Sequence, residues 1–259
     1  MERKFTSLVV KDRIAYISLN RPEKRNALNA ELVQNLKDTF KEVEKNDDVK
    51  VIVLKANGDA FCAGADLAYL QQLQKNTYEE NLADSNHLKE LFEQIYTLKK
   101  VVIAQVEGHA IAGGGGLATV CDFVYAVPEA KFGFTEVRIG FVPAIISLFI
   151  LRKIGETKTK ELLFTGDLVT AQKAKAMGLI NQVVEAGNIE DEVYDFAQKI
   201  IANCSADSLA LTKQLLANVA SKHYQDGLNY ASEMNAKARA TKDCVQGISS
   251  FLNKKKNKW

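Results

Sequence analysis

A buried strand that leads into a loop of small residues and then into a helix occurs twice in this chain, and that repetition limits the folds open to it. The first unit has an apolar run at 50–54 (KVIVL) and a Gly/Ala-rich loop at 57–66 (NGDAFCAGAD). The second has an apolar run at 101–106 (VVIAQV) and a glycine loop at 108–116. Strand-loop-helix units in succession predict an α/β fold.

The flanking sequence indicates where this core begins and ends. Two β-rich runs, 5–10 and 13–19, predict a hairpin, and Asn29 is placed to cap a helix. A further strand is expected at 123–127, and the chain is mostly helical from about residue 156. We therefore predict a core over 1–195 and a helical C-terminal region over 196–259.

The two small-residue loops have a chemical interpretation. Residues 63–66 (AGAD) and 113–116 (GGGG) let a ligand approach the backbone closely, because they carry no bulky side chains. Each loop enters a helix, whose first NH groups lack intrahelical acceptors and favour negative charge. Two such donors form an oxyanion hole, in which one donor contributes about 3–4 kcal/mol. Neither loop matches the dinucleotide or P-loop motif.

Composition excludes several other classes of function. The 34 basic and 32 acidic residues give a net charge of +2, which implies no general attraction to nucleic acid or to a membrane surface. The four cysteines have no metal-ligand spacing, so we expect free thiols, no metal and a cytoplasmic protein. The sequence shows no signal peptide, and its longest apolar stretch is too short to span a membrane.

Five segments carry a family resemblance: 21–28 (RPEKRNAL), 61–67 (FCAGADL), 108–117 (GHAIAGGGGL), 132–140 (FGFTEVRIG) and 171–181 (AQKAKAMGLIN). In this order and spacing they resemble the enoyl-CoA hydratase/isomerase (crotonase) superfamily over nearly the whole chain. Within it, 65–71 (ADLAYLQ) and 136–147 (EVRIGFVPAIIS) look like bacterial methylglutaconyl-CoA hydratases of leucine degradation.

The resemblance implies a spiral of ββα units, a helical region used in trimer contacts, and assembly into trimers or hexamers. It implies an acyl-CoA thioester substrate of fatty acid or leucine metabolism, with no cofactor besides the coenzyme A that the substrate carries. By position, Ala65 and Gly113 would form the oxyanion hole and Glu136 would be catalytic. The implied contacts to coenzyme A or substrate are Lys24, Arg25, Ala27, Ala63, Gly64, Asp66, Leu67 and Gly116. Asp66 is also placed to cap the helix that begins at Leu67.

One position departs from the pattern of the family's hydratases, which use two glutamates. Gly116 stands where the first would be, and Glu136 matches the second. We interpret the chain as a hydratase that works with Glu136. The alternatives are a 3,2-enoyl-CoA isomerase, in which one base shuttles a proton, and a non-catalytic acyl-CoA-binding protein. A thioesterase or decarboxylase of the same family also stays open, because one oxyanion hole serves many reactions. If residues 136–138 are extended, Arg138 points to the same side as Glu136 and either meets an acidic acyl group or, as we favour, forms a structural ion pair.

Overall fold

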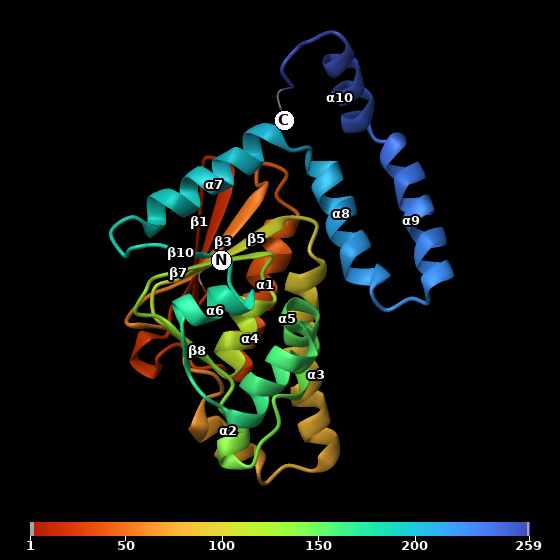
Figure 1. Cartoon of the computed structure of the whole chain (residues 1–259). Coiled ribbons are helices and arrows are strands. Elements are labelled where there is room, and N and C mark those ends of the chain that lie inside the picture. Colours follow the sequence, from red (N-terminus) through yellow and green to blue (C-terminus); the bar gives the residue numbers. More distant parts are fainter. Residues whose placement is uncertain (1–2, 258) are drawn as a thin grey trace.

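The computed structural model describes residues 3–257 and 259, and it builds them around two sheets (Figure 1). The larger sheet has the strand order β1-β2-β3-β5-β7-β10 and is parallel except for the β1–β2 hairpin. Its strands are β1 Thr6–Lys11, β2 Ile14–Leu19, β3 Val51–Ala56, β5 Val101–Val106, β7 Phe123–Ala126 and β10 Gln182–Val183.

A second, smaller sheet is made of very short strands in the order β4-β6-β8-β9. Its members are β4 Ala60–Cys62, β6 His109–Ile111, β8 Lys131–Gly133 and β9 Val169–Thr170. Strands β4, β6 and β8 are parallel neighbours, and β9 is antiparallel to β8. Because parallel strands have their carboxyl ends at one edge, the loops that leave β4, β6 and β8 emerge side by side.

From β3 to β8, successive strands of the chain belong alternately to the larger and the smaller sheet, and this alternation generates the spiral. In each of three successive turns, the first strand joins the larger sheet, the second joins the smaller sheet, and a helical segment follows. The turns are β3-β4-α2, β5-β6-α4 and β7-β8-η2-α5, with α2 at Leu67–Leu73, α4 at Gly113–Thr119, the 3-10 helix η2 at Glu136–Ile139 and α5 at Ala144–Thr165. This architecture confirms the expected α/β spiral of ββα units.

The remaining helices of the core cover the sheets. Helix α7 packs on β3, β5 and β7, α6 packs on β8 to β10, and α1 packs against β1 and α3. Their bounds, with those of the 3-10 helix η1, are η1 Pro22–Lys24, α1 Ala30–Glu44, α3 Tyr78–Thr97, α6 Ala171–Met177 and α7 Ile189–Asn203. The expected division after residue 195 falls inside α7, a helix that belongs to the core by its contacts.

Three helices extend from the core at the C-terminus: α8 Ala206–Val219, α9 Tyr224–Arg239 and α10 Lys242–Leu252. Figure 1 shows α9 and α10 standing apart from the sheets. Helix α8 is held to the core by Lys213, whose ammonium lies 2.6 Å from Asp122 and 3.1 Å from the Lys100 carbonyl. Within the described part of the chain, no helix combines the length and apolar character that a membrane span requires.

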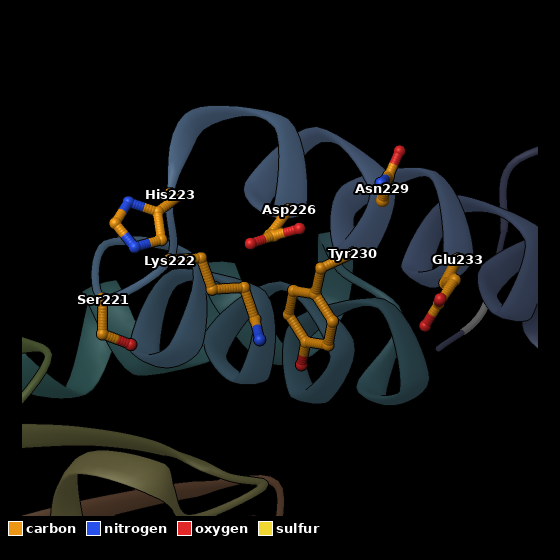
Figure 2. Close-up of a pocket in the computed structure, with 7 residues that line it drawn as sticks. All are labelled: Ser221, Lys222, His223, Asp226, Asn229, Tyr230 and Glu233. Carbon is orange, nitrogen blue, oxygen red and sulfur yellow. The ribbon is translucent and has the colours of Figure 1, made fainter.

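A polar surface pocket lies at the turn between α8 and α9 (Figure 2). The Lys222 ammonium lies 4.9 Å from the ring centroid of Tyr230 in this pocket. The lining residues are Ser221, Lys222, His223, Asp226, Asn229, Tyr230 and Glu233. None of them comes from the two glycine loops or from the segment around Glu136, so this pocket is separate from the predicted site.

Candidate active site

The first glycine loop follows β4 and is held in place by the segment that precedes α1. The Leu28 amide donates to the Gly64 carbonyl at 2.7 Å, and the Asp66 amide donates to the Leu28 carbonyl at 2.8 Å. Between these two bonds, the Ala65 amide has no hydrogen-bond partner within residues 3–257 and 259. The loop is therefore rigid on both sides of one free backbone donor.

The second loop follows β6 and turns sharply into α4. The Ala112 amide donates to the Gly133 carbonyl at 2.7 Å, which ties this turn to β8, and Ala112 has a positive φ of 50°. Gly113 is the first residue of α4, and the first intrahelical bond runs from the Gly116 amide to the Ala112 carbonyl at 3.0 Å. The Gly113 amide thus lies at a helix N-terminus without an intrahelical acceptor.

The two loops touch each other, and glycine makes that contact possible. A Cβ atom at Gly64 would lie 2.8 Å from the Ala112 Cβ and 3.5 Å from the Gly113 nitrogen, and Gly64 has a φ of +91°. Only glycine adopts this backbone conformation at such close range without strain. The contact brings Gly64, the residue before Ala65, against Gly113, so the segments that carry the two free amides lie next to each other.

Glu136 follows β8, the next strand of the small sheet, as the first residue of η2. Its Oε2 atom is buried and has no hydrogen-bond partner in the part of the chain that the structure describes. Burial raises the pKa of Glu136 above the ordinary value of 4.5. A buried carboxylate oxygen without a partner costs stability, so its presence on the segment after β8, the strand that neighbours β6 in the small sheet, indicates a chemical role.

A buried ion pair between Arg21 and Asp66 holds the first glycine loop in place. The Arg21 guanidinium lies 2.7 Å from the Asp66 carboxylate, and the two side chains are only 10% and 12% exposed. Asp66 also accepts hydrogen bonds from the amides of Ala68 at 3.0 Å and Tyr69 at 3.4 Å. The predicted helix cap at Asp66 is therefore confirmed, and the same side chain joins α2 to the segment before η1.

Breaking this pair should destabilise the protein. We expect Arg21→Met to lower the free energy of unfolding by about 3–5 kcal/mol, because it leaves the Asp66 carboxylate buried and uncompensated. Urea unfolding followed by circular dichroism measures the change. Asp66→Asn is the matched control, since it removes the charge and retains an oxygen for the cap. The double variant should lose less than the sum of the single losses; strictly additive losses would contradict the pairing.

The predicted coenzyme A contacts lie on the turn next to the first loop. Lys24 and Arg25 are exposed, and the Arg25 carbonyl accepts a hydrogen bond from the Ala63 amide at 3.0 Å. Asn26 holds this turn to the start of β4, because its side-chain amide donates at 2.9 Å to the carbonyl of Ala60. Two cations are thus exposed beside the glycine loop, whereas the adjoining Ala27 is buried.

The other two predicted contacts differ in their surroundings. Leu67 begins α2 and is 73% exposed. Gly116 is buried in α4, and a Cβ atom there would lie 2.2 Å from the Ile146 Cγ2 atom and 3.4 Å from the Phe92 ring. No side chain fits at this position as the core is packed. The described residues also contain no group of three or more His, Cys, Asp or Glu side chains arranged for a metal ion.

Comparison with known proteins places this chain in a family. The family model described as enoyl-CoA hydratase/isomerase matches residues 10–259. The chain belongs to this family. A Thermus thermophilus protein whose name marks it as a candidate enoyl-CoA hydratase is 41% identical, over 95% of this chain and 97% of that protein. A crotonyl-CoA hydratase of Syntrophomonas wolfei is 34% identical, over 95% of this chain and 94% of that protein.

Solved structures of the enoyl-CoA hydratase/isomerase family have the same fold. A crystal structure of an enoyl-CoA hydratase from Shewanella pealeana superposes with a TM-score of 0.93 at 28% identity, covering 100% of this chain and 97% of that one. In this chain, Ala65, Gly113 and Glu136 lie on the segments that follow three adjacent strands of the small sheet, β4, β6 and β8.

One expectation about this family member was wrong, and two residues were missed. Residues 136–138 are not extended but form η2, and Arg138 pairs with Asp167 at the surface, as the structural ion pair interpretation requires. Sequence reasoning gave no role to Arg21 or Ile146. Arg21 belongs to the family-like segment 21–28 (RPEKRNAL), so the sequence did contain a sign that this residue matters. Ile146 became significant only through its contact with Gly116.

Proposed function

We propose that this enzyme adds water to the double bond of a 2-enoyl-CoA thioester, with Glu136 as the acid/base group. The observation that supports this most is the buried Glu136 Oε2 atom, which has no partner among the described residues and lies on a segment that leaves the small sheet at the same edge as the free amides of Ala65 and Gly113. An α,β-unsaturated thioester becomes an enolate during hydration, and its oxygen then carries a negative charge. Two preorganised amides suit that charge.

A single carboxylate can complete this reaction. In the ionised form, Glu136 accepts a proton from water while the water oxygen bonds to C3 of the acyl chain. The double-bond electrons move toward the thioester oxygen, which the amides of Ala65 and Gly113 stabilise as an enolate. The neutral Glu136 then returns the proton to C2. One water molecule is consumed, and the carboxylate is regenerated.

Exposed and loop residues of the described chain support a proposed mode of substrate binding and a proposed assembly. Lys24 and Arg25 would contact the phosphates of coenzyme A, and Ala27, Ala63, Gly64, Asp66 and Leu67 would line the thioester arm. Exposed apolar side chains near and in α5 and in the C-terminal helices, such as Phe141, Phe164 and Phe251, support a homotrimer or a hexamer. We propose a cytoplasmic enzyme of this kind, with 3-methylglutaconyl-CoA among its candidate substrates.

A 3,2-enoyl-CoA isomerase is the second candidate, favoured by the packing at Gly116. Isomerisation needs one base, which takes a proton from C2 of a 3-enoyl thioester and returns it to C4. The first turn of α4 carries no second carboxylate, because Ile146 fills that space. The two reactions share the enolate and the oxyanion hole and differ in whether oxygen is added.

An assay in ¹⁸O-labelled water separates the candidates. We expect oxygen uptake into crotonyl-CoA or 3-methylglutaconyl-CoA, detected by mass spectrometry, and no uptake with Glu136→Gln. Migration of the double bond in a 3-enoyl-CoA without oxygen uptake would instead establish the isomerase. Tight acyl-CoA binding with no turnover of any of the three thioesters would contradict both and leave a binding role.

A further inference from the structure

The first turn of α4 contains a position that the present packing closes to every side chain. A Cβ atom at Gly116 would lie 2.2 Å from the Ile146 Cγ2 atom and 3.2 Å from its Cβ atom. Separations below 3.0 Å essentially never occur for real Cβ atoms. Glycine at 116 and a β-branched residue at 146 therefore depend on each other.

Ile146 has little freedom to move away. It is 3% exposed and lies in the first turn of α5, where a β-branched side chain has one strongly preferred rotamer. Phe92 is fully buried behind the same space, and its ring packs edge-on against Phe149 with centroids 6.3 Å apart. The overlap at 116 cannot be relieved by a small rotation, so either Gly116 or Ile146 must change.

The closed position lies on α4, the helix that begins with the Gly113 amide. Gly116 lies three residues after Gly113, so the two share one face of α4. The neighbouring Gly115 packs against the Phe134 ring, which would lie 3.0 Å from a Cβ atom at Gly115 and stands two residues before Glu136. A side chain at 116 would be directed at Ile146 on α5, the helix that contacts both α4 and the Glu136 segment η2.

We propose that Ile146 is the residue that sets the number of acid/base groups in this site. By filling the space next to Gly116 it keeps the adjoining wall apolar, excludes a second carboxyl group from α4, and leaves proton transfer to Glu136. A carboxylate forced into this apolar wall would be desolvated without a partner, at a large cost. This inference rests on the proposed function for its chemical consequence, whereas the packing dependence between 146 and 116 stands without it.

Thermal unfolding of single and double variants tests the packing dependence. Gly116→Ala is expected to lower Tm by about 5–10 °C, because overpacking in a domain of this size has effects of that order. In an Ile146→Ala background the same change should lower Tm by less than about 2 °C, since the obstructing Cγ2 atom is gone. Ile146→Val is the matched control, because valine keeps both branches at Cβ and the loss should persist. An equal loss in all three backgrounds would overturn the dependence.

The chemical consequence is tested with the ¹⁸O assay. In the Ile146→Ala background, Gly116→Glu supplies a second carboxyl group and Gly116→Gln supplies the same shape without it. We expect the ratio of oxygen uptake to double-bond migration to be at least about tenfold higher for the glutamate variant, as a positioned acid/base group contributes that much or more. Equal ratios in the two variants would refute the chemical role.

A wrong proposed function would be recognised in the unmodified enzyme, separately from the role of Ile146. If the unmodified enzyme turns over none of the three thioesters, the proposed function and the chemical role of Ile146 are both refuted. The Tm series is unaffected by that outcome and still decides whether Ile146 closes position 116.

Discussion

Replacing Glu136 with glutamine is expected to lower kcat/KM for the preferred thioester by about 10²–10⁴-fold, the usual contribution of a positioned acid/base group. The amide retains the size of the side chain and cannot take a proton from water. Stopped turnover with unchanged acyl-CoA binding, measured by calorimetry, would locate the defect in the chemical step. A variant with full activity would show that Glu136 does not move the proton.

The raised pKa of Glu136 gives a pH dependence with a defined sign. The base must be ionised, so activity should fall as the pH drops through a pKa above the ordinary 4.5. Burial favours the neutral form, which means that ionising Glu136 costs folding stability as the pH rises through that pKa. Glu136→Gln should therefore be more stable than the unmodified enzyme at neutral pH, and the difference should vanish below pH 4.5. A constant difference at all pH values would contradict this origin.

The parts of the fold that sequence predicted well are those with strong local signals. The hairpin at 6–19 has its turn at Asp12 and Arg13, both with positive φ, and Asn29 caps α1 through a 2.9 Å bond to the Leu32 amide. Strand β5 has the predicted bounds, 101–106. Alternation, turn residues and caps act over a few neighbours, so they can be read without knowing the tertiary structure.

The small sheet and the start of α5 could not be predicted in the same way. Strands β4, β6 and β8 have three residues each, too few for a periodic pattern, and they exist because the neighbouring loops pair. The sequence indicated mostly helical structure from about residue 156, and a helical segment does start there, because α5 is interrupted at Gly155 (φ 74°). The part of α5 from Ala144 to that kink was not predicted. Its first turns are apolar all round, so they lack the periodicity that marks an amphipathic helix.

The candidate site likewise contains features that the sequence predicted and contacts that it did not. Gly113 at a helix start and the small residues around Ala65 could be chosen from sequence, because a free amide near glycine has a local cause. The closeness of Gly64 to Gly113 depends on the parallel pairing of β4 with β6, which no local pattern reveals. The Gly116–Ile146 contact joins residues 30 positions apart on two helices, and only packing discloses it.

Removing the Gly113 amide tests the oxyanion hole directly. We expect Gly113→Pro to lower kcat by about 10²–10³-fold, the loss associated with one oxyanion donor. At the first residue of α4 the fixed φ of proline is helical and its missing NH breaks no intrahelical bond, but proline disfavours the backbone of the preceding Ala112, with φ 50° and ψ −125°, so some loss of Tm is also expected. Turnover is compared at a temperature well below the Tm of the variant, where circular dichroism verifies that it is folded.

Gly113→Ala is the control that separates the missing donor from the added atoms. Its Cβ would lie 3.2 Å from the Leu28 Cδ1 atom, the end of a flexible side chain, and 4.0 Å from the Gly64 Cα. Alanine keeps the NH, so we expect a loss of turnover no greater than about threefold, the effect of roughly 0.6 kcal/mol. If the alanine and proline variants lose turnover equally, the defect is steric and the Gly113 amide is not the donor. A selective loss in the proline variant, with the coenzyme A affinity unchanged, assigns the Gly113 amide to the enolate oxygen, because only an interaction that strengthens in the transition state lowers kcat alone.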